Sequence, residues 1–277
     1  MNDTLKVGLA QCLPTADVGE IIRVASHKDC EIVVFPEMFS NGYSSFSADD
    51  SSAAAEWVAA AEPLDGSFVR KFQKLAKQYR LAIVVTLLEK TEAKPCNTAL
   101  LIDQEGEIVL QHRKNHICFF SIPESECTAG TEAGVVSLMT SVGAVRTGIL
   151  ICMDREYPDV MQALVAQDVE LVLVPNSCQL IDDPEVGDVR VAGVRAKAFE
   201  SVVGIAVSNY PAPKHDGHSF AVDGLGRVIA QGDTSETLVV ASFPLGELRR
   251  LQESEWFRRV DKARGERVNS PPANDPG

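Results

Sequence analysis

Residues 81–88 read LAIVVTLL, and this stretch decides the class of fold. It has the length of a strand, and it is apolar at nearly every position instead of alternating between apolar and polar side chains. A strand of this kind is covered on both faces, as in sheets that have helices packed against them. Residues 32–35, IVVF, have the same character. The two stretches predict a sheet that is buried on both sides.

Other short apolar segments, rich in Val, Ile and Leu, follow one another along the chain and end in turn residues. The complete set of predicted strands is Leu5–Ala10, Ile32–Phe35, Leu81–Leu88, Ala99–Ile102, Ile108–Leu110, Val145–Ile151, Leu171–Val174, Val202–Val207 and Leu238–Phe243. Segments of helical period lie between several of these strands, at Ser67–Tyr79, Asp159–Gln167 and Val189–Phe199. Two hairpin turns are predicted at residues 103–106 (DQEG) and 223–226 (DGLG). Strands that alternate with helices indicate an α/β protein.

The chain of 277 residues is long enough for one large domain, and no Gly/Ser-rich linker or internal repeat divides it. We predict a single domain over residues 1–267. The last ten residues, 268–277, read VNSPPANDPG and are polar and rich in proline. Such a segment is expected to be a disordered or extended tail.

The composition restricts the class of partner. A formal net charge of −13 disfavours nucleic acid and anionic membrane surfaces. No apolar run approaches the roughly 18 residues that a membrane-spanning helix needs, and the N-terminus lacks the pattern of a signal peptide. The seven cysteines are scattered, without a CxxC pair, which is typical of free thiols in a reducing compartment. We therefore expect a cytoplasmic protein that acts on a small molecule.

Three predicted strands end in ionisable groups. Ile32–Phe35 leads into Glu37, the strand that begins at Ile108 leads into Lys114, and Val145–Ile151 leads into Cys152. Ligands of α/β proteins bind beyond the carboxyl ends of the strands, so the three groups are candidates for one site. Each of them, taken alone, has an ordinary explanation: Glu37 as a loop carboxylate, Lys114 as a surface lysine and Cys152 as a small buried residue. Together they fit a thiol nucleophile with a base and an oxyanion-stabilising cation.

The histidines offer two alternatives. His112 and His116, or His215 and His218, have spacings that can bind zinc, but no HExxH motif is present, and we expect no metal and no organic cofactor. One of these histidines can instead serve as the base for Cys152, which would leave Glu37 without a role.

Three blocks of this sequence resemble the catalytic blocks of the nitrilase, or carbon–nitrogen hydrolase, superfamily. They are FPEMFSNGYS (35–44), HRKNHIC (112–118) and GILICMDREYPD (148–159), and they stand in the order of the family. The resemblance covers roughly residues 5 to 250. It implies a four-layer α-β-β-α sandwich and a homodimer or higher homo-oligomer. The first helix departs from the family, because the stretch from residue 13 to residue 29 has room for only a short, irregular one.

The resemblance also implies roles for individual residues. Glu37 matches the general base, Lys114 the lysine that holds the tetrahedral intermediate, and Cys152 the nucleophile. A second glutamate of the family matches Glu124 best, with Glu126 as the alternative.

Met153 and Arg155, which follow the cysteine, are candidates for binding the substrate. The backbone N–H of Met153 is expected to face the oxyanion. Arg155 either binds a substrate carboxylate, as arginines in this stretch do in branches that act on N-carbamoyl amino acids, or forms a structural ion pair. Asp154 is expected to lock the turn by bonding to nearby backbone N–H groups.

The function implied by the resemblance is hydrolysis of non-peptide carbon–nitrogen bonds in small linear amides or N-carbamoyl compounds. The reaction would pass through a thioester on cysteine and release ammonia. Two alternatives stay open: a non-catalytic binding protein on the same fold, and a glutaminase-type subunit of an amidotransferase.

Overall fold

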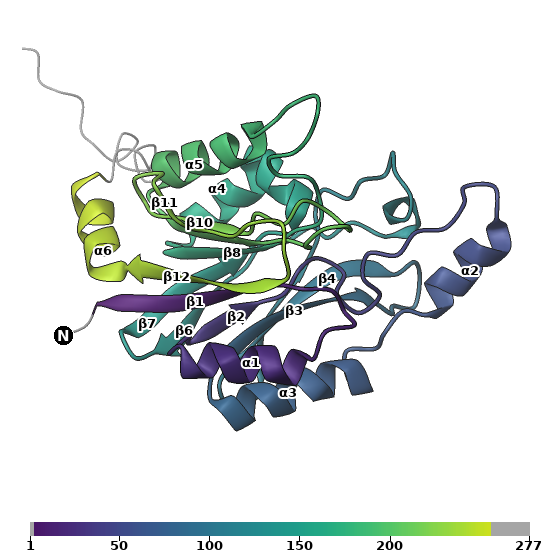
Figure 1. Ribbon diagram of the computed structural model, residues 1–277, viewed down its shortest axis with the longest axis horizontal. Coiled ribbons are helices and arrows are strands. Elements are labelled where there is room, and N and C mark those ends of the chain that lie inside the picture. The colour runs from purple at the N-terminus through teal and green to yellow at the C-terminus, as the bar shows by residue number, and fades with distance from the viewer. Residues whose placement is uncertain (1–2, 256–277) are drawn as a thin grey trace, which may run out of the picture.

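The computed structural model describes residues 3–255, in which two six-stranded sheets pack face to face (Figure 1). The first sheet contains, in spatial order, β12 (Thr237–Pro244), β1 (Thr4–Gln11), β2 (Ile32–Val34), β3 (Ala82–Glu89), β4 (Cys96–Ile102) and β5 (Ile108–Arg113). The second sheet contains β11 (Val228–Gln231), β10 (Phe220–Val222), β9 (Gly204–Ser208), β8 (Leu171–Pro175), β7 (Gly143–Ile149) and β6 (Val135–Thr140).

The strand directions decide where a site can form. In the first sheet β1, β2 and β3 are parallel, and β4 and β5 follow as antiparallel neighbours, so that β5 runs in the same direction as β3. In the second sheet β7, β8 and β9 are parallel. The strands of the first sheet therefore have the carboxyl ends of β2 and β5 and the amino end of β4 at the same end of the sheet.

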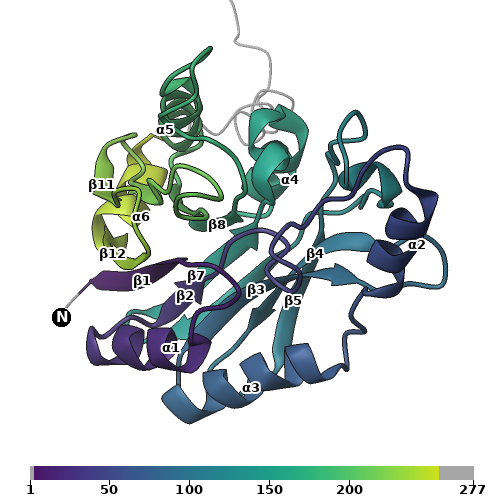
Figure 2. The same ribbon diagram turned by 45° about the vertical axis from the view of Figure 1, so that its right-hand side comes forward.

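Helices cover the outer face of each sheet. The helices of the described residues are α1 (Val18–His27), α2 (Ser51–Ala59), α3 (Ser67–Tyr79), α4 (Pro158–Ala166), α5 (Val189–Ser201) and α6 (Leu245–Ser254), with short 3₁₀ helices η1 (Glu124–Glu126) and η2 (Cys152–Glu156), and four of them cover the sheets. Helices α1 and α3 lie side by side against the first sheet, and α4 and α5 cover the second (Figures 1 and 2). The layer order is helix, sheet, sheet, helix, and the predicted α-β-β-α sandwich is confirmed.

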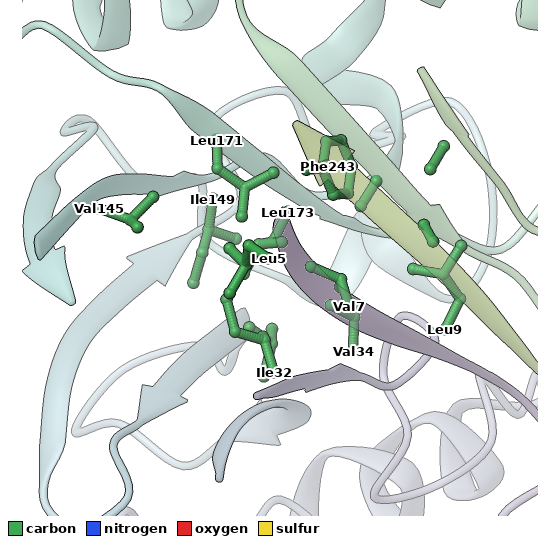
Figure 3. Packing of buried hydrophobic residues seen from close by; sticks show 14 of the residues in the cluster. Leu5, Val7, Leu9, Ile32, Val34, Val145, Ile149, Leu171, Leu173 and Phe243 are labelled. Carbon is green, nitrogen blue, oxygen red and sulfur yellow. The ribbon is translucent and has the colours of Figure 1, made fainter. Parts of the chain in front are cut away.

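Three apolar layers hold these elements together. The central layer lies between the sheets, where Leu5, Val7 and Ile32 of the first sheet face Ile149 and Leu173 of the second (Figure 3). The other two layers lie between each sheet and its helices. Strand β3 is buried at every position because it contributes to two of these layers, which explains the uninterrupted apolar run LAIVVTLL.

Local sequence accounts for the helix boundaries. Helix α3 spans the predicted residues and buries Val69, Phe72 and Ala76 on one face. The expectation of an irregular first helix is wrong, because α1 is a regular helix of ten residues. Its start is fixed by Asp17, whose carboxylate accepts hydrogen bonds from the N–H groups of Gly19 and Glu20.

Both predicted hairpins are present, joining β4 to β5 and β10 to β11. In each one the first aspartate accepts hydrogen bonds from backbone N–H groups of its own turn. The end of the predicted domain at residue 267 and the predicted tail over 268–277 lie outside the described residues. Among residues 3–255, no helix is both long and apolar enough to cross a membrane.

Candidate active site

Glu37 lies just beyond the carboxyl end of β2 and is fully buried. Its Oε1 accepts hydrogen bonds from Lys114 Nζ and Asn97 Nδ2, each at 2.7 Å. Its Oε2 has no hydrogen-bond partner within residues 3–255. Burial, with a further contribution from the nearby Cys152 thiol, raises the pKa of Glu37 well above its ordinary value. One carboxylate oxygen is therefore fixed and the other is free to take up a proton.

Lys114 follows β5 and is fully buried between two carboxylates. Its Nζ lies 2.7 Å from Glu37 Oε1 and 2.7 Å from Glu124 Oε1. Burial alone would lower the pKa of Lys114, but the attraction of Glu37, of Cys152 and of Glu124 outweighs burial and raises it well above its ordinary value. The ammonium group therefore stays charged inside the protein.

Glu124 starts η1 and is also fully buried. Its Oε2 accepts hydrogen bonds from Lys114 Nζ and from the backbone N–H of Cys118. Burial opposes ionisation, but Lys114 and this backbone N–H outweigh it and lower the pKa of Glu124. The alternative, Glu126, faces outward and pairs with Lys94 at 3.4 Å. Of the two glutamates, only Glu124 contacts Lys114.

The two carboxylates around Lys114 therefore differ in their affinity for a proton. The pKa of Glu37 is raised and that of Glu124 is lowered. Such a separation assigns different tasks to paired acids. Glu124 is suited to hold Lys114 in place as a permanent anion, and Glu37 is suited to exchange a proton.

Asn97, near the amino end of β4, joins the two carboxylates and was not predicted from the sequence. Its Nδ2 donates to Glu37 Oε1 at 2.7 Å and to Glu124 Oε1 at 2.8 Å. Its main chain also holds the lysine, because the N–H of Lys114 donates to the carbonyl of Asn97 at 2.8 Å. A polar pair, Asn97-Thr98, inside the otherwise apolar stretch of β4 was the available signal.

Replacing Asn97 with leucine is expected to alter the pH dependence of activity. The substitution removes the two donors, so the pKa of Glu37 should rise further and the acidic limb of the pH–kcat profile should move to higher pH. Loss of the buried hydrogen bonds should also lower the free energy of unfolding by about 1–3 kcal/mol.

Thr98→Val is the matched control for this prediction. Thr98 follows Asn97 on β4. Its hydroxyl donates to a carboxylate oxygen of Glu89 at 2.6 Å, away from Lys114. This variant should lose stability and keep the wild-type pH profile. Equal profiles for Asn97→Leu and wild type would contradict the positioning role of Asn97.

Cys152 is the first residue of η2, on the sharp turn that follows β7, and its backbone has a φ of +43°. A non-glycine residue in this region is strained, and such strain is often found at functional sites. The turn places the side chain at the edge of the sheet at the start of a 3₁₀ helix. Met153 is the next residue, and N–H groups at a helix start have no acceptor within the helix. This arrangement suits the predicted contact between the Met153 N–H and an oxyanion.

Asp154 locks this turn, as predicted, and also ties it to the lysine loop. Its Oδ2 accepts the N–H of Ile151 at 3.1 Å, and its Oδ1 accepts the N–H groups of Asn115 and His116 at 3.0 and 2.8 Å. His112 Nε2 lies 2.8 Å from Asp154 Oδ2. The position of Cys152 is thereby coupled to that of Lys114.

The hydrogen bonds of the histidines point away from the thiol. His112 bonds to Asp154, while His116 bonds to Asp159 and His215 to Ser177. His112 and His116 therefore engage different carboxylates instead of a common centre. In the described part of the chain this geometry favours Glu37 over a histidine as the base for Cys152.

Arg155 is buried behind the thiol. Its Nη1 donates to the carbonyl of Cys152 at 2.6 Å, and its Nη2 lies 3.3 Å from Glu156 Oε1. A cavity of about 160 Å³ is bordered by Arg155, Glu156, Val189, Arg190, Gly193, Val194 and Lys197. Three of these residues are cationic, so the cavity is suited to an anionic group. The ion pair with Glu156 matches the structural alternative, and the cationic cavity matches the binding of a carboxylate.

Tyr43 borders the site and was also missed. Burial raises the pKa of its hydroxyl, and Glu37, Glu124 and Cys152 raise it further. Its backbone is held in a left-handed conformation, and its carbonyl accepts a hydrogen bond from Lys214 at 2.9 Å. The influence of Glu37, Glu124 and Cys152 on this hydroxyl indicates that Tyr43 lies near the site.

A thiol, an ammonium group and two carboxylates lie at one end of an α-β-β-α sandwich, as the resemblance to the nitrilase superfamily implies. The sequence profile of the carbon–nitrogen hydrolase family matches residues 15–253. The chain belongs to this family. It is an amidohydrolase that acts on carbon–nitrogen bonds other than peptide bonds.

Individual relatives agree with this assignment. An (R)-stereoselective amidase of a Pseudomonas species is 29% identical over 226 residues, which are 80% of this chain and 76% of the amidase. The structure of a carbon–nitrogen hydrolase from Helicobacter pylori matches with a TM-score of 0.77 at 20% identity, over 93% of this chain and 95% of that one. A mutant of an amidase from Nesterenkonia, at 22% identity, matches with a TM-score of 0.68 over 92% of this chain and 96% of its own. That mutant carries the acetamide moiety of fluoroacetamide covalently added at its active-site cysteine.

Proposed function

We propose that this chain hydrolyses small linear amides or N-carbamoyl compounds through a thioester on Cys152. The observation that carries the proposal is the free Oε2 of buried Glu37, beside the Cys152 thiol, while Oε1 is held by Lys114. A buried carboxylate with one uncommitted oxygen is suited to move a proton. The covalent adduct on the active-site cysteine of the Nesterenkonia amidase supports a cysteine nucleophile.

In the first step the Cys152 thiol transfers its proton to Glu37 Oε2 while Sγ bonds to the carbonyl carbon. A base is needed, because the interaction with the Cys178 thiol, together with burial, raises the pKa of Cys152 well above its ordinary value. The raised pKa of Glu37 helps the carboxyl group to keep the proton until it is needed.

The carbonyl oxygen becomes an oxyanion, which Lys114 Nζ and the N–H of Met153 stabilise. Each donor of this kind contributes roughly 3 kcal/mol to the transition state. Glu124 and Asn97 keep Lys114 and Glu37 in position, so little rearrangement is required when the charge develops.

The tetrahedral intermediate collapses when its carbon–nitrogen bond breaks and the proton on Glu37 passes to the leaving ammonia or amine. Water then gives a proton to Glu37 and its oxygen attacks the thioester carbon. The carbon–sulfur bond breaks, and the thiolate of Cys152 recovers the proton from Glu37. The residues of the site supply every proton transfer in this sequence.

Arg155 is proposed to bind a carboxylate of the substrate. Its guanidinium is buried beside Cys152, and the adjoining cavity also presents Arg190 and Lys197. A bidentate contact between arginine and a carboxylate would orient an N-carbamoyl amino acid or an ω-amide of a dicarboxylic acid.

Ammonia release from a matched panel tests this substrate class. The panel contains N-carbamoyl amino acids and ω-amides of dicarboxylic acids, each beside a neutral analogue without the carboxylate. Wild type is expected to prefer the carboxylated members. Arg155→Met should lose about 10²-fold in kcat/KM toward them, the cost of a lost charge-assisted contact, with a much smaller loss on neutral amides.

Equal losses on carboxylated and neutral compounds would instead assign Arg155 a structural role. No turnover of any panel member would favour the binding-protein alternative. Turnover restricted to glutamine would favour the glutaminase-type subunit. Assembly as a homodimer or higher homo-oligomer and a cytoplasmic location stay predictions, which size-exclusion chromatography with light scattering and cell fractionation would test.

A further inference from the structure

A second thiol, Cys178, lies beside Cys152. Strands β7 and β8 are parallel neighbours in the second sheet, with Ile149 paired to Leu173. Cys152 follows the end of β7, and Cys178 lies in the loop after β8. The topology therefore delivers both cysteines to the same edge of the sheet.

One guanidinium contacts both sulfur atoms. Arg155 Nη1 lies 3.8 Å from Cys152 Sγ, and Nη2 lies 3.3 Å from Cys178 Sγ. Each thiol also shifts the pKa of the other through a hydrogen-bonding interaction. Asn176 Nδ2 approaches Cys178 Sγ at 3.4 Å from the other side. Cys178 is thus surrounded by donors that stabilise a thiolate.

The protonation states of the two sulfurs differ. The hydrogen bond from Cys152, followed by Arg155 and Asn176, lowers the pKa of Cys178 to about 6. The same hydrogen bond raises the pKa of Cys152. The surroundings of the pair therefore favour a negative charge on Cys178 over one on Cys152.

The other five cysteines differ from Cys178, and all seven lie within the described residues. Burial raises the pKa of their thiols, to about 12 for Cys12, Cys118 and Cys127, to about 11 for Cys30, and in the same direction for Cys96. Thiolates react with peroxides and thiols do not, so oxidation should select Cys178.

We propose that Cys178 and Cys152 form a dithiol site that hydrogen peroxide converts into a disulfide, which reversibly blocks the amidohydrolase. Formation of the disulfide requires the loop that carries Cys178, which has no regular secondary structure before α5, to bring its sulfur to bonding distance of Cys152. In the blocked state the sulfur of Cys152 is bonded and unable to attack a substrate.

The reaction has two steps. The Cys178 thiolate attacks one oxygen of hydrogen peroxide, the O–O bond breaks, hydroxide leaves and Cys178 becomes a sulfenic acid. The sulfur of Cys152 then attacks the sulfenic sulfur, the S–O bond breaks, and the Cys152 proton and the departing hydroxide form water. Overall two thiols and one peroxide give one disulfide and two waters, and a dithiol reductant reverses the change.

The test treats wild type, Cys178→Ser and Cys118→Ser with hydrogen peroxide in the absence of substrate, followed by catalase. Cys118 is the matched control, because its sulfur lies 3.9 Å from Lys114 Nζ but outside the pair. Digestion without reductant and mass spectrometry should yield linked peptides containing residues 152 and 178 from wild type and from Cys118→Ser. Cys178→Ser should yield none.

Activity supplies the second readout, and each variant is compared with its own untreated sample. Wild type should lose about tenfold or more of its activity and regain it with dithiothreitol. Cys178→Ser should keep most of the activity of its untreated sample, because burial keeps Cys152 as a thiol and the reactive thiolate is absent. Cys178→Ala repeats the measurement if the serine variant folds poorly.

Absence of the linked peptides in oxidised wild type would overturn the proposal, as would a disulfide that joins Cys118 to either residue. The activity readout rests on the proposed role of Cys152, and the mass readout does not. Linked peptides without loss of activity would refute the blocking role of the disulfide and would separately contradict the proposed nucleophile.

Discussion

Cys152→Ala is expected to lower kcat at least 10⁴-fold toward any amide that the wild type turns over. Removing the nucleophile removes the covalent pathway altogether, and loss of the nucleophile in comparable enzymes costs about 10⁶-fold. The effect should fall on chemistry and not on folding. Alanine keeps the β-carbon of Cys152, and the deleted sulfur is small. Ammonia release and urea denaturation would be measured on the same samples.

Two variants serve as comparisons for Cys152→Ala. Cys30→Ala removes another buried thiol, in the apolar layer between the first sheet and its helices, and is expected to keep wild-type kcat. Cys178→Ala removes the neighbouring thiol of low pKa and tests whether that sulfur is the nucleophile instead. An active Cys152→Ala together with an inactive Cys178→Ala would transfer the nucleophilic role to Cys178.

Lys114→Met is expected to produce the second large effect, on both activity and stability. The ammonium group is the counter-ion of Glu37 and Glu124, and all three side chains have no solvent exposure. Breaking a buried ion pair by removing one partner costs about 3–5 kcal/mol of unfolding free energy. Loss of the oxyanion donor should also lower kcat by about 10²–10³-fold.

The stability loss in Lys114→Met should depend on pH. Without the ammonium group, both buried carboxyls should have pKa values above those in the unfolded chain. Their charged forms then destabilise the folded protein at neutral pH, and the penalty disappears as pH falls toward the unfolded pKa near 4.3. The stability difference between wild type and Lys114→Met should therefore shrink between about pH 7 and pH 5.

Lys114→Met combined with Glu124→Gln is the matched control. The double variant removes one of the two uncompensated charges, so it should recover part of the stability and none of the activity. A Lys114→Met protein as stable as wild type at pH 7 would contradict the ionised network. An active one would contradict the oxyanion role of Lys114.

Much of this architecture could be predicted because its signals are local. Buried strands such as β3 are uninterrupted apolar runs, and Glu37, Lys114 and Cys152 stand where such runs end. The resemblance to catalytic blocks added Glu124. In the structure Glu124 is buried against Lys114, whereas Glu126 pairs with Lys94. Spacing along the chain alone does not show this difference.

The missed features depend on contacts between segments that lie far apart in the sequence. Asn97 lies outside the predicted strand Ala99–Ile102, and its importance comes from carboxylates 60 and 27 residues away. Cys178 looked like one more scattered cysteine, and it gains its low pKa from Cys152 and Arg155. Strand β6 was missed because most of its positions are exposed or half-buried, so it lacks the apolar run of the central strands.

The central claim is a thioester on Cys152, and acid-quench mass spectrometry during turnover tests it most directly. Enzyme and a good amide substrate are mixed, quenched in acid within the first turnovers, and digested. We predict that the peptide containing Cys152 carries the acyl group of the substrate, that hydroxylamine removes this group, and that Cys152→Ala shows no adduct. An acyl group on Cys178, or rapid turnover with no acylated cysteine at any quench time, would contradict the account.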